Sequence, residues 1–166
     1  QMYIPSEVPW TLDQAERFLL EVNRDRAGCE VLLTLDVGHQ AGMHYGLEGA
    51  DLDYREWLRR FGAATEVIHL QQTTPDASHH WPFTEPFNER GHIRIEETLE
   101  ALRHSHEQFA ASPLAAVLPP AEQAILIVEA IPGSTKTEAQ LLDESQATAE
   151  YLRRYIPPGG LTWRVG

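Results

Sequence analysis

Four side chains of the kind that bind metal ions or move protons stand at or near the ends of separate apolar runs. They are Glu7, Asp36, His69 and Glu129. Carboxylates and an imidazole form an oxygen- and nitrogen-rich set that suits a divalent cation such as Mn, Mg, Co or Zn. Three carboxylates crowded at one point repel each other unless a cation lies between them. The set therefore predicts one divalent metal ion.

Each of these residues also has an ordinary structural explanation when it is taken alone. Glu7 can be an acid at the entry to a helix, His69 a hydrogen-bonded core histidine, and Glu129 a solvated residue at a strand end. Asp36 can cap a turn, with His39 a solvated loop residue beyond it. The occurrence of such residues in four consecutive segments is what favours the metal site.

The elements that must position these residues alternate between strands and helices. Short apolar runs predict strands at Met2–Glu7, Val31–Asp36, Glu66–Gln71 and Ala124–Glu129. Apolar residues at helical spacing predict helices over about 11–24, 53–61, 95–111 and 137–156. A continuous apolar run is typical of a parallel strand that is covered on both faces. Parallel strands share one carboxyl rim, so the four side chains are expected to meet there.

The segment Gln72–Arg94 is too long for an ordinary connection, and it is rich in proline, histidine and aromatic residues. Long loops in compact domains are usually functional or disordered. We expect this one to be ordered and to form the wall of a substrate pocket, with His80, Trp81 and Phe83 facing that pocket.

The alternation of elements predicts an α/β fold, either four strands of a (β/α)8 barrel or a small open sheet. Four parallel strands leave two edges of unpaired backbone groups, which invite pairing with another chain. A barrel of this class takes about 250 residues, whereas this chain has 166. We therefore expect residues 1–166 to be the C-terminal part of a single TIM-barrel domain, with the four strands equivalent to its strands 5–8.

Composition narrows the range of partners. The net charge is −12, from 25 acidic and 13 basic residues, and such a surface repels phosphate backbones and anionic membranes. A small-molecule substrate is therefore expected rather than nucleic acid or a membrane, and a homo-oligomer stays open. The single cysteine, Cys29, excludes an intrachain disulfide and a cysteine-rich zinc site. No apolar run approaches 18 residues and no signal-peptide pattern is present, which favours a cytoplasmic protein.

Four motifs resemble the xylose isomerase-like TIM-barrel superfamily, which contains sugar isomerases, ketose 3-epimerases and endonuclease IV. They are SEVPW with Glu7, LDVGH with Asp36 and His39, VIHLQQT with His69, and ILIVEA with Glu129. In the ketose-epimerase branch, a Glu, an Asp, a His and a second Glu bind one divalent metal in this chain order. The stretch from IHLQQT through HHWPFT to FN is also similar to sugar-phosphate epimerases of the erythrulose-phosphate type.

The resemblance implies a metal-dependent sugar or sugar-phosphate isomerase or epimerase that transfers a proton beside a ketose carbonyl through an enediolate. Glu7 and Glu129 would exchange that proton from opposite sides of the substrate, because epimerisation needs a base on each face. The histidine of the D-x-x-H element, here His39, would hold a substrate oxygen.

Two further expectations depend on the resemblance. The family's arginine soon after the metal-binding histidine is absent, and Arg90 or Arg94 is the substitute that the sequence offers. The turn Pro132–Thr137 follows the last strand, where barrels commonly hold phosphate, so Ser134 and Lys136 are expected to bind it. The same segment is also explained as a plain turn that caps the next helix.

Other functions stay open on the sequence alone. The same scaffold supports aldose–ketose isomerisation and inosose-type dehydration. An endonuclease IV-like DNA repair enzyme needs several zinc ions and more ligands than these segments offer, and the negative charge of the chain opposes DNA. A non-catalytic half-barrel module would bind no metal.

Overall fold

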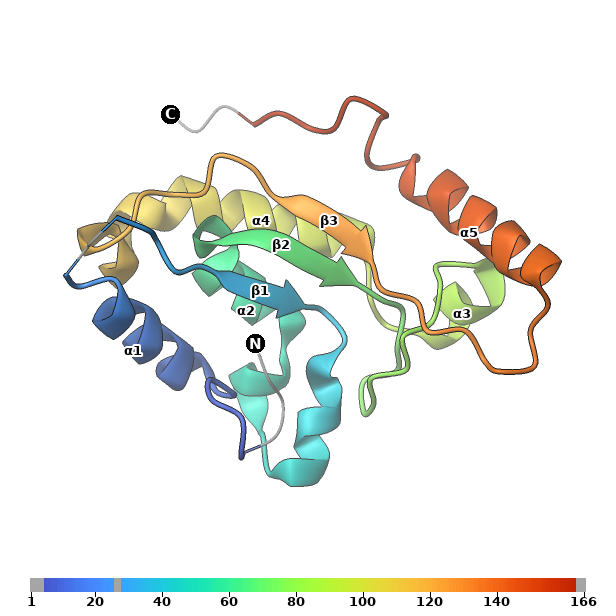
Figure 1. Cartoon of the computed structure of the whole chain (residues 1–166), viewed down its shortest axis with the longest axis horizontal. Helices are drawn as coiled ribbons and strands as arrows, with labels where there is room; N and C mark the ends of the chain where they lie inside the picture. The colour runs from blue at the N-terminus through green and yellow to red at the C-terminus, as the bar shows by residue number, and fades with distance from the viewer. Residues whose placement is uncertain (1–4, 26–27, 164–166) are drawn as a thin grey trace.

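The sheet is parallel and has three strands in the described part of the chain. The computed structural model describes residues 5–25 and 28–163, apart from the side chains of residues 40 and 41. Its strands lie in the order β1-β2-β3, and they are β1 Leu33–Asp36, β2 Thr65–Leu70 and β3 Ile125–Val128 (Figure 1). Asp36 pairs with His69, and His69 pairs with Ile127. The register therefore brings the carboxyl ends of the three strands to one edge.

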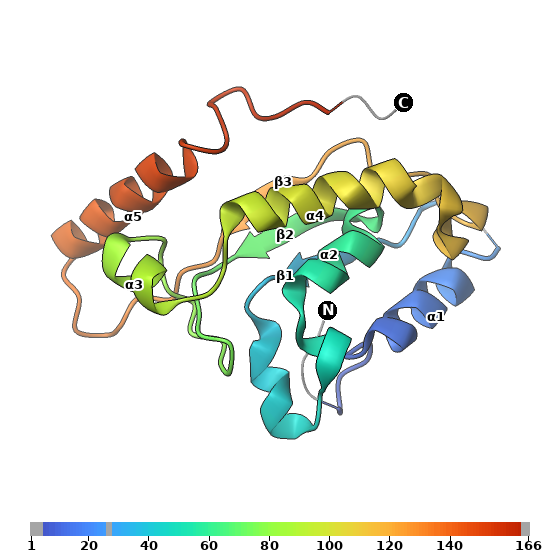
Figure 2. The same ribbon diagram turned by 180° about the vertical axis from the view of Figure 1, so that it is seen from behind.

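Helices cover one face of this sheet. The α-helices in the described residues are α1 Leu12–Val22, α2 Tyr54–Phe61, α3 Glu85–Arg90, α4 Ile95–Gln108 and α5 Glu138–Leu152. Helices α2 and α4 pack against each other and lie in front of the sheet in Figure 2. Helix α5 lies beside α3, beyond the end of β3 (Figure 1). No helix in the described part of the chain has the length and apolar character to cross a bilayer.

Side-chain caps fix where three of the helices begin. Thr11, Asp53 and Thr137 are the N-cap residues of α1, α2 and α5, and the side chain of each accepts a hydrogen bond from a backbone N–H of the first turn. Thr137 also forms a full capping box with Gln140. These starts confirm the helix positions that the sequence predicts.

The two faces of the sheet differ in their cover. The face toward α2 and α4 carries residues that lie in register across the three strands, namely Leu35, Ile68 and Leu126. On the opposite face of β3, Ile125 and Ile127 stay 51% and 43% exposed. Asp36 and His69 are in register with Ile127 and so share this second face. The expectation that all strands are covered on both faces is therefore wrong for β3.

The predicted half-barrel is also wrong, because the described residues form an open sheet of three strands. Of the predicted strand Met2–Glu7, residues 1–4 lie outside the described residues, and Pro5–Glu7 form a turn and a bend with Glu7 exposed. Pro5 supplies a physical reason, since a proline has no N–H to donate to a strand ladder. The prediction is therefore wrong for Pro5–Glu7.

The structure describes the whole of the long segment Gln72–Arg94, which is not wholly irregular. Gln72 and Trp81 exchange two backbone hydrogen bonds of 2.8 and 3.0 Å, which close a tight loop. Helix α3 then begins after Thr84, with Pro86 in its first turn, where the missing N–H costs nothing. The sequence does not predict this helix, because six residues are too few to show helical periodicity.

Candidate metal centre

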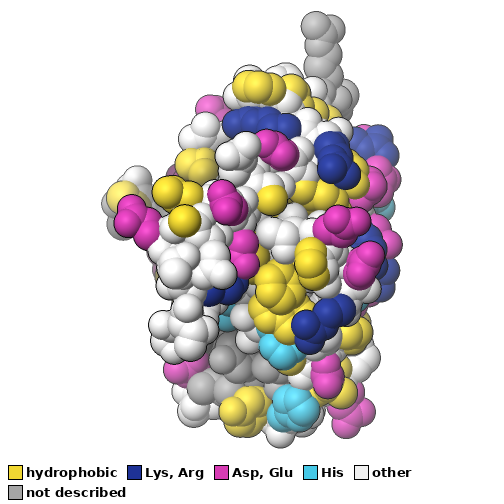
Figure 3. All heavy atoms as spheres, turned by 90° about the vertical axis from the view of Figure 1, so that its right-hand side faces the viewer, with side chains coloured by type: hydrophobic (Ala, Val, Ile, Leu, Met, Phe, Trp, Pro, Cys, Tyr) yellow, Lys and Arg dark blue, Asp and Glu magenta, His cyan; other side chains and the backbone are white. Residues whose placement is uncertain are grey.

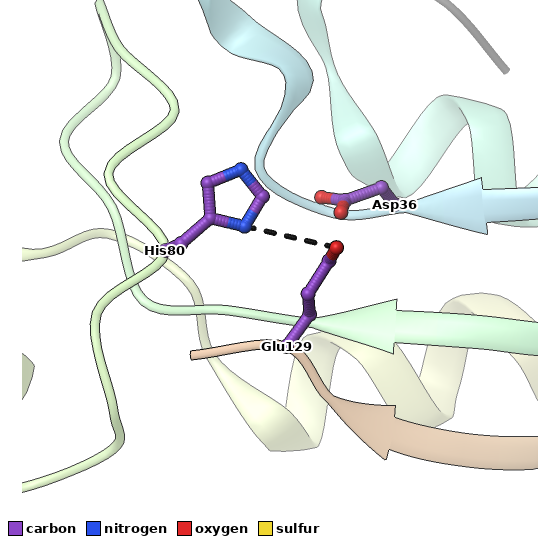
Figure 4. A group of neighbouring side chains, drawn as sticks. All are labelled: Asp36, His80 and Glu129. Atoms are coloured by element: carbon purple, nitrogen blue, oxygen red, sulfur yellow. Dashed lines mark ion pairs between the residues drawn. The ribbon is translucent and has the colours of Figure 1, made fainter. Parts of the chain in front are cut away.

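Residues from three successive strands and one loop meet at the carboxyl edge of the sheet. Asp36 is the last residue of β1, His69 is the next-to-last residue of β2, and Glu129 follows β3 directly. His80 comes from the loop after β2. Figure 4 shows Asp36, His80 and Glu129 pointing toward one another, and each offers a ligand atom within 4.8 Å of the others.

The distances within this cluster fit a single divalent ion. Nδ1 of His69 lies 3.0 Å from Oε2 of Glu129 and 3.9 Å from Oδ2 of Asp36. Nδ1 of His80 lies 3.6 Å from the same oxygen of Glu129. Two ligand atoms that each lie about 2.1 Å from one ion are about 3.0 Å apart at a right angle and about 4.2 Å apart when opposite. The three separations of 3.0, 3.6 and 3.9 Å fall within this range, so these pairs of atoms have the spacing of ligands around one ion.

The cluster is closed at its base and open toward solvent. The Asp36 side chain is 4% exposed, whereas those of His69 and Glu129 are 30% and 39% exposed. Figure 3 views the molecule toward the carboxyl ends of the strands and shows histidine side chains at the surface, among hydrophobic and acidic ones. Charged and neutral donors at a half-open edge can hold an ion and still leave room for a ligand from solvent.

A glycine and a buried amide hold Asp36 in place. Its Oδ1 accepts hydrogen bonds from the backbone N–H of Gly38, at 2.6 Å, and from Nε2 of Gln71, at 2.9 Å. A Cβ atom at position 38 would lie 2.0 Å from Cδ of Gln71. The glycine of the D-x-G-H element is therefore needed for space, because the Gln71 side chain occupies the place of its missing Cβ.

The structure brings together three of the four predicted metal ligands, namely Asp36, His69 and Glu129. Glu7 is exposed in the turn before α1 and is not part of this group. The predicted substrate ligand His39 lies next to the group, with Nε2 3.6 Å from Oδ2 of Asp36. The two carboxylates that were expected to exchange the proton therefore do not share one site. Glu129 lies in the cluster, and Glu7 lies outside it.

The aromatic residues of the long loop mostly contact each other. The Trp81 ring stacks on His79, with ring centres 4.0 Å apart, and on Phe87, at 5.0 Å. The guanidinium of Arg90 lies 4.7 Å from the centre of the Trp81 ring. Phe83, which was expected to face a pocket, is fully buried and stacks on a tyrosine of α5. Phe83 is thus a packing residue, because the loop folds back against α5.

The residues expected to bind phosphate lie in the turn before α5. Ser134 is exposed there. Nζ of Lys136 lies 2.6 Å from both carboxylate oxygens of Glu144, and 5.6 Å from the centre of the Phe87 ring. Lys136 therefore joins the turn to α5 and α3, and an anion that binds at this turn competes with Glu144 for its charge.

Burial changes the pKa of one histidine in the long segment Gln72–Arg94. Burial lowers the pKa of His92, whose Nδ1 lies 3.0 Å from the carbonyl oxygen of Thr73. A neutral ring that donates from Nδ1 to this carbonyl satisfies both groups. His92 therefore stabilises the start of the loop rather than adding a positive charge near the cluster.

Gln71 was not predicted to be part of the site, and His80 was predicted only for the wall of the pocket. The available signal was the pair of polar glutamines that directly follow a buried strand, at the edge where ligands gather. Both Gln71 and Gln72 are fully buried. Buried amides are hydrogen-bonded almost without exception, so their position at this edge indicates a structural or positioning role.

A comparison of the sequence with models of protein families finds no matching family, and a comparison with curated proteins finds no match either.

Proposed function

We propose that the chain is a divalent-metal-dependent isomerase or epimerase that moves a proton beside the carbonyl group of a sugar or sugar phosphate. The observation that carries the proposal is the convergence of Asp36, His69, His80 and Glu129 at one half-open edge. Two carboxylates with two imidazoles form a donor set that suits Mn, Co, Zn or Mg. Three of the four motifs that resemble the sugar isomerases, those with Asp36, His69 and Glu129, supply residues of this cluster.

Each residue has a role in this proposal. Asp36, His69 and His80 hold the ion, with Asp36 fixed at the base by Gln71. Glu129 is the most exposed of the four, so its carboxylate is placed to take the proton from a bound substrate and return it. The ion, when bound, supplies Lewis-acid stabilisation of the negative charge that develops on the substrate oxygens. His39 lies at the rim, where it can donate to a substrate hydroxyl.

The arrangement of bases favours isomerisation over epimerisation. Epimerisation requires one base on each face of the substrate carbon, and the partner expected for Glu129 was Glu7. Among the described residues, Glu7 lies outside the cluster, whereas Glu129 lies within it. A single carboxylate suffices to move a proton between two neighbouring carbons on one face of an enediolate. Aldose–ketose isomerisation is therefore our first choice of reaction.

Metal titration tests the centre. We expect Co²⁺ or Mn²⁺ to bind the metal-free protein with a stoichiometry of one, as measured by calorimetry. Asp36→Asn removes a ligand charge and should weaken binding by at least about 10–100-fold. Glu66→Gln is the matched control, because Glu66 is an exposed carboxylate near the amino end of β2, away from the carboxyl edge where the cluster lies. Equal binding by all three proteins contradicts the assignment.

Turnover tests the chemistry. Glu129→Gln should lower turnover by about 10²–10⁴-fold on any aldose or ketose phosphate that wild-type protein converts. Product formed in D₂O should carry deuterium at the carbon that loses the proton. An absence of deuterium in the product excludes proton exchange with solvent and favours hydride transfer instead. Deuterium with inverted configuration at one carbon identifies epimerisation, the second candidate reaction.

A further inference from the structure

We infer that Gln71 is a positioning residue of this centre. It joins a ligand on a strand, Asp36, to a ligand on a loop, His80, and it holds the His80 ring in the tautomer that presents Nδ1 to the cluster. This inference rests on the proposed metal centre and adds the residue that assembles its donor set.

Both polar atoms of the Gln71 side-chain amide, Nε2 and Oε1, have hydrogen-bond partners. Nε2 donates to Oδ1 of Asp36 at 2.9 Å and lies 3.2 Å from Nδ1 of His80. Oε1 accepts from the backbone N–H of His80 at 2.7 Å and from the hydroxyl of Ser78 at 3.3 Å. A carboxylate can only accept and a backbone N–H can only donate, so these partners fix which end of the amide is oxygen.

This orientation also fixes the tautomer of His80. Nε2 of Gln71 has only hydrogens to offer, and it lies nearer to Nδ1 of His80, at 3.2 Å, than to Nε2 of the same ring, at 3.5 Å, so we assign Nδ1 as the acceptor, without a proton. The ring proton then lies on Nε2, which is 3.3 Å from the hydroxyl oxygen of Ser78. Nδ1 is also the atom that faces Glu129 at 3.6 Å. It has a single lone pair, so an ion that binds there takes the place of the Gln71 hydrogen, while Gln71 keeps its bonds to Asp36 and to the His80 backbone. A histidine that binds a metal through one ring nitrogen usually donates from the other, and Ser78 supplies that acceptor.

The backbone of His80 needs the same support. Its φ is 52°, and it is the one residue other than glycine in the described chain with a positive φ. Residues with a side chain are disfavoured in this left-handed region, and they persist where surrounding contacts fix them. The 2.7 Å bond from the His80 N–H to Gln71 is such a contact. Gln71 therefore fixes both the backbone and the ring of His80.

The test compares Gln71→Met with Gln72→Met. Methionine has nearly the length of glutamine but cannot form the hydrogen bonds. Gln72 is equally buried, but its amide bonds to Asn88 and to the backbone of Ile93, away from the cluster. We expect Gln71→Met to lower Co²⁺ affinity about 10–100-fold, whereas Gln72→Met leaves it within twofold. Equal losses in the two variants overturn the inference, because they indicate general loosening of the loop.

The second measurement needs no metal. In metal-free protein labelled with ¹⁵N-histidine, Nδ1 of His80 should resonate as an unprotonated nitrogen and Nε2 as a protonated one. Gln71→Met should move both signals toward the average of the two tautomers. Ser78→Ala, a milder change, should shift them in the same direction if Gln71→Met does not fold. Signals that stay unchanged in the variants overturn the inference.

A double-variant comparison separates positioning from stability. His80→Ala removes the ring, so Gln71→Met should weaken Co²⁺ binding less in that background than in wild type. Full additivity of the two losses overturns the role of Gln71. Wild-type protein that binds no Co²⁺ overturns the metal centre itself, and the role of Gln71 in metal binding with it. Wild-type binding that Gln71→Met retains in full overturns only the role of Gln71.

Discussion

Replacing Gly38 by alanine tests how tightly the base of the cluster is packed. The φ of Gly38 is −103°, which alanine adopts without strain, so backbone freedom is not the reason for glycine here. The new Cβ would lie 2.0 Å from Cδ of Gln71 and 2.4 Å from its Cγ and Oε1. Real Cβ atoms do not approach other atoms so closely, so Gln71 has to move.

The size of the effect follows from what Gln71 loses when it moves. Forcing extra volume into a packed interior costs about 1–3 kcal/mol. Each buried hydrogen-bonding group left without its partner costs about 1–3 kcal/mol, and the bonds to Asp36 and His80 are both at risk. We expect Gly38→Ala to lower the free energy of unfolding by about 3–5 kcal/mol, a large part of the about 5–15 kcal/mol of a typical domain. Co²⁺ affinity should fall about 10–100-fold as well.

Urea denaturation followed by circular dichroism measures the first effect. Gly133→Ala is the control, because no atom lies within 4 Å of its Cβ position and its φ is not in the left-handed region. It should change stability by less than about 0.5 kcal/mol. In the double variant Gly38→Ala/Gln71→Ala, the shorter side chain at position 71 removes the clash with the new Cβ. This variant should regain part of the stability but none of the metal affinity. A loss below about 1 kcal/mol for Gly38→Ala alone would falsify the packing argument.

Three further predictions concern the loop, a buried histidine and α5. Gly91→Ala places a Cβ 2.1 Å from Oε1 of Gln72 and should cost about 2–4 kcal/mol in urea denaturation, and an unchanged midpoint would count against this contact. Burial lowers the pKa of His106 from its ordinary 6.5, so the unfolded chain binds the proton more readily; the free energy of unfolding should be highest above pH 6.5 and fall as pH drops toward the lowered pKa. His106→Gln should flatten this slope between pH 5 and 7, and an unaltered slope assigns it to other groups. Thr137→Ala removes the capping box with Gln140 and should destabilise α5 by about 1 kcal/mol, seen as roughly fivefold faster amide exchange in α5, whereas unchanged exchange makes the cap irrelevant to α5.

Among the described residues, the sequence was sufficient for the three strands, for helices α1, α2, α4 and α5, and for part of the site. Strong local signals placed them, because an apolar run such as Val31–Leu35 and a cap such as Thr11 act within a few residues. The meeting of Asp36, His69 and Glu129 was also predictable, since parallel strands end at one edge and each residue stands at the end of a strand. The predicted first strand is wrong for Pro5–Glu7, the part within the described residues, where a proline cannot donate to a strand ladder.

Only the tertiary structure decided how the centre is completed. His80 reaches the cluster through a left-handed backbone conformation that no sequence spacing specifies. Gln71 joins it to Asp36 across 35 residues of chain, and Gly38 leaves the room for that contact. Lys136, which the sequence offers as a phosphate ligand, binds Glu144 instead, because the turn folds back on α5. Contacts of this kind depend on the path of a whole loop and on the space left by distant side chains, whereas periodicity and caps describe only neighbours along the chain.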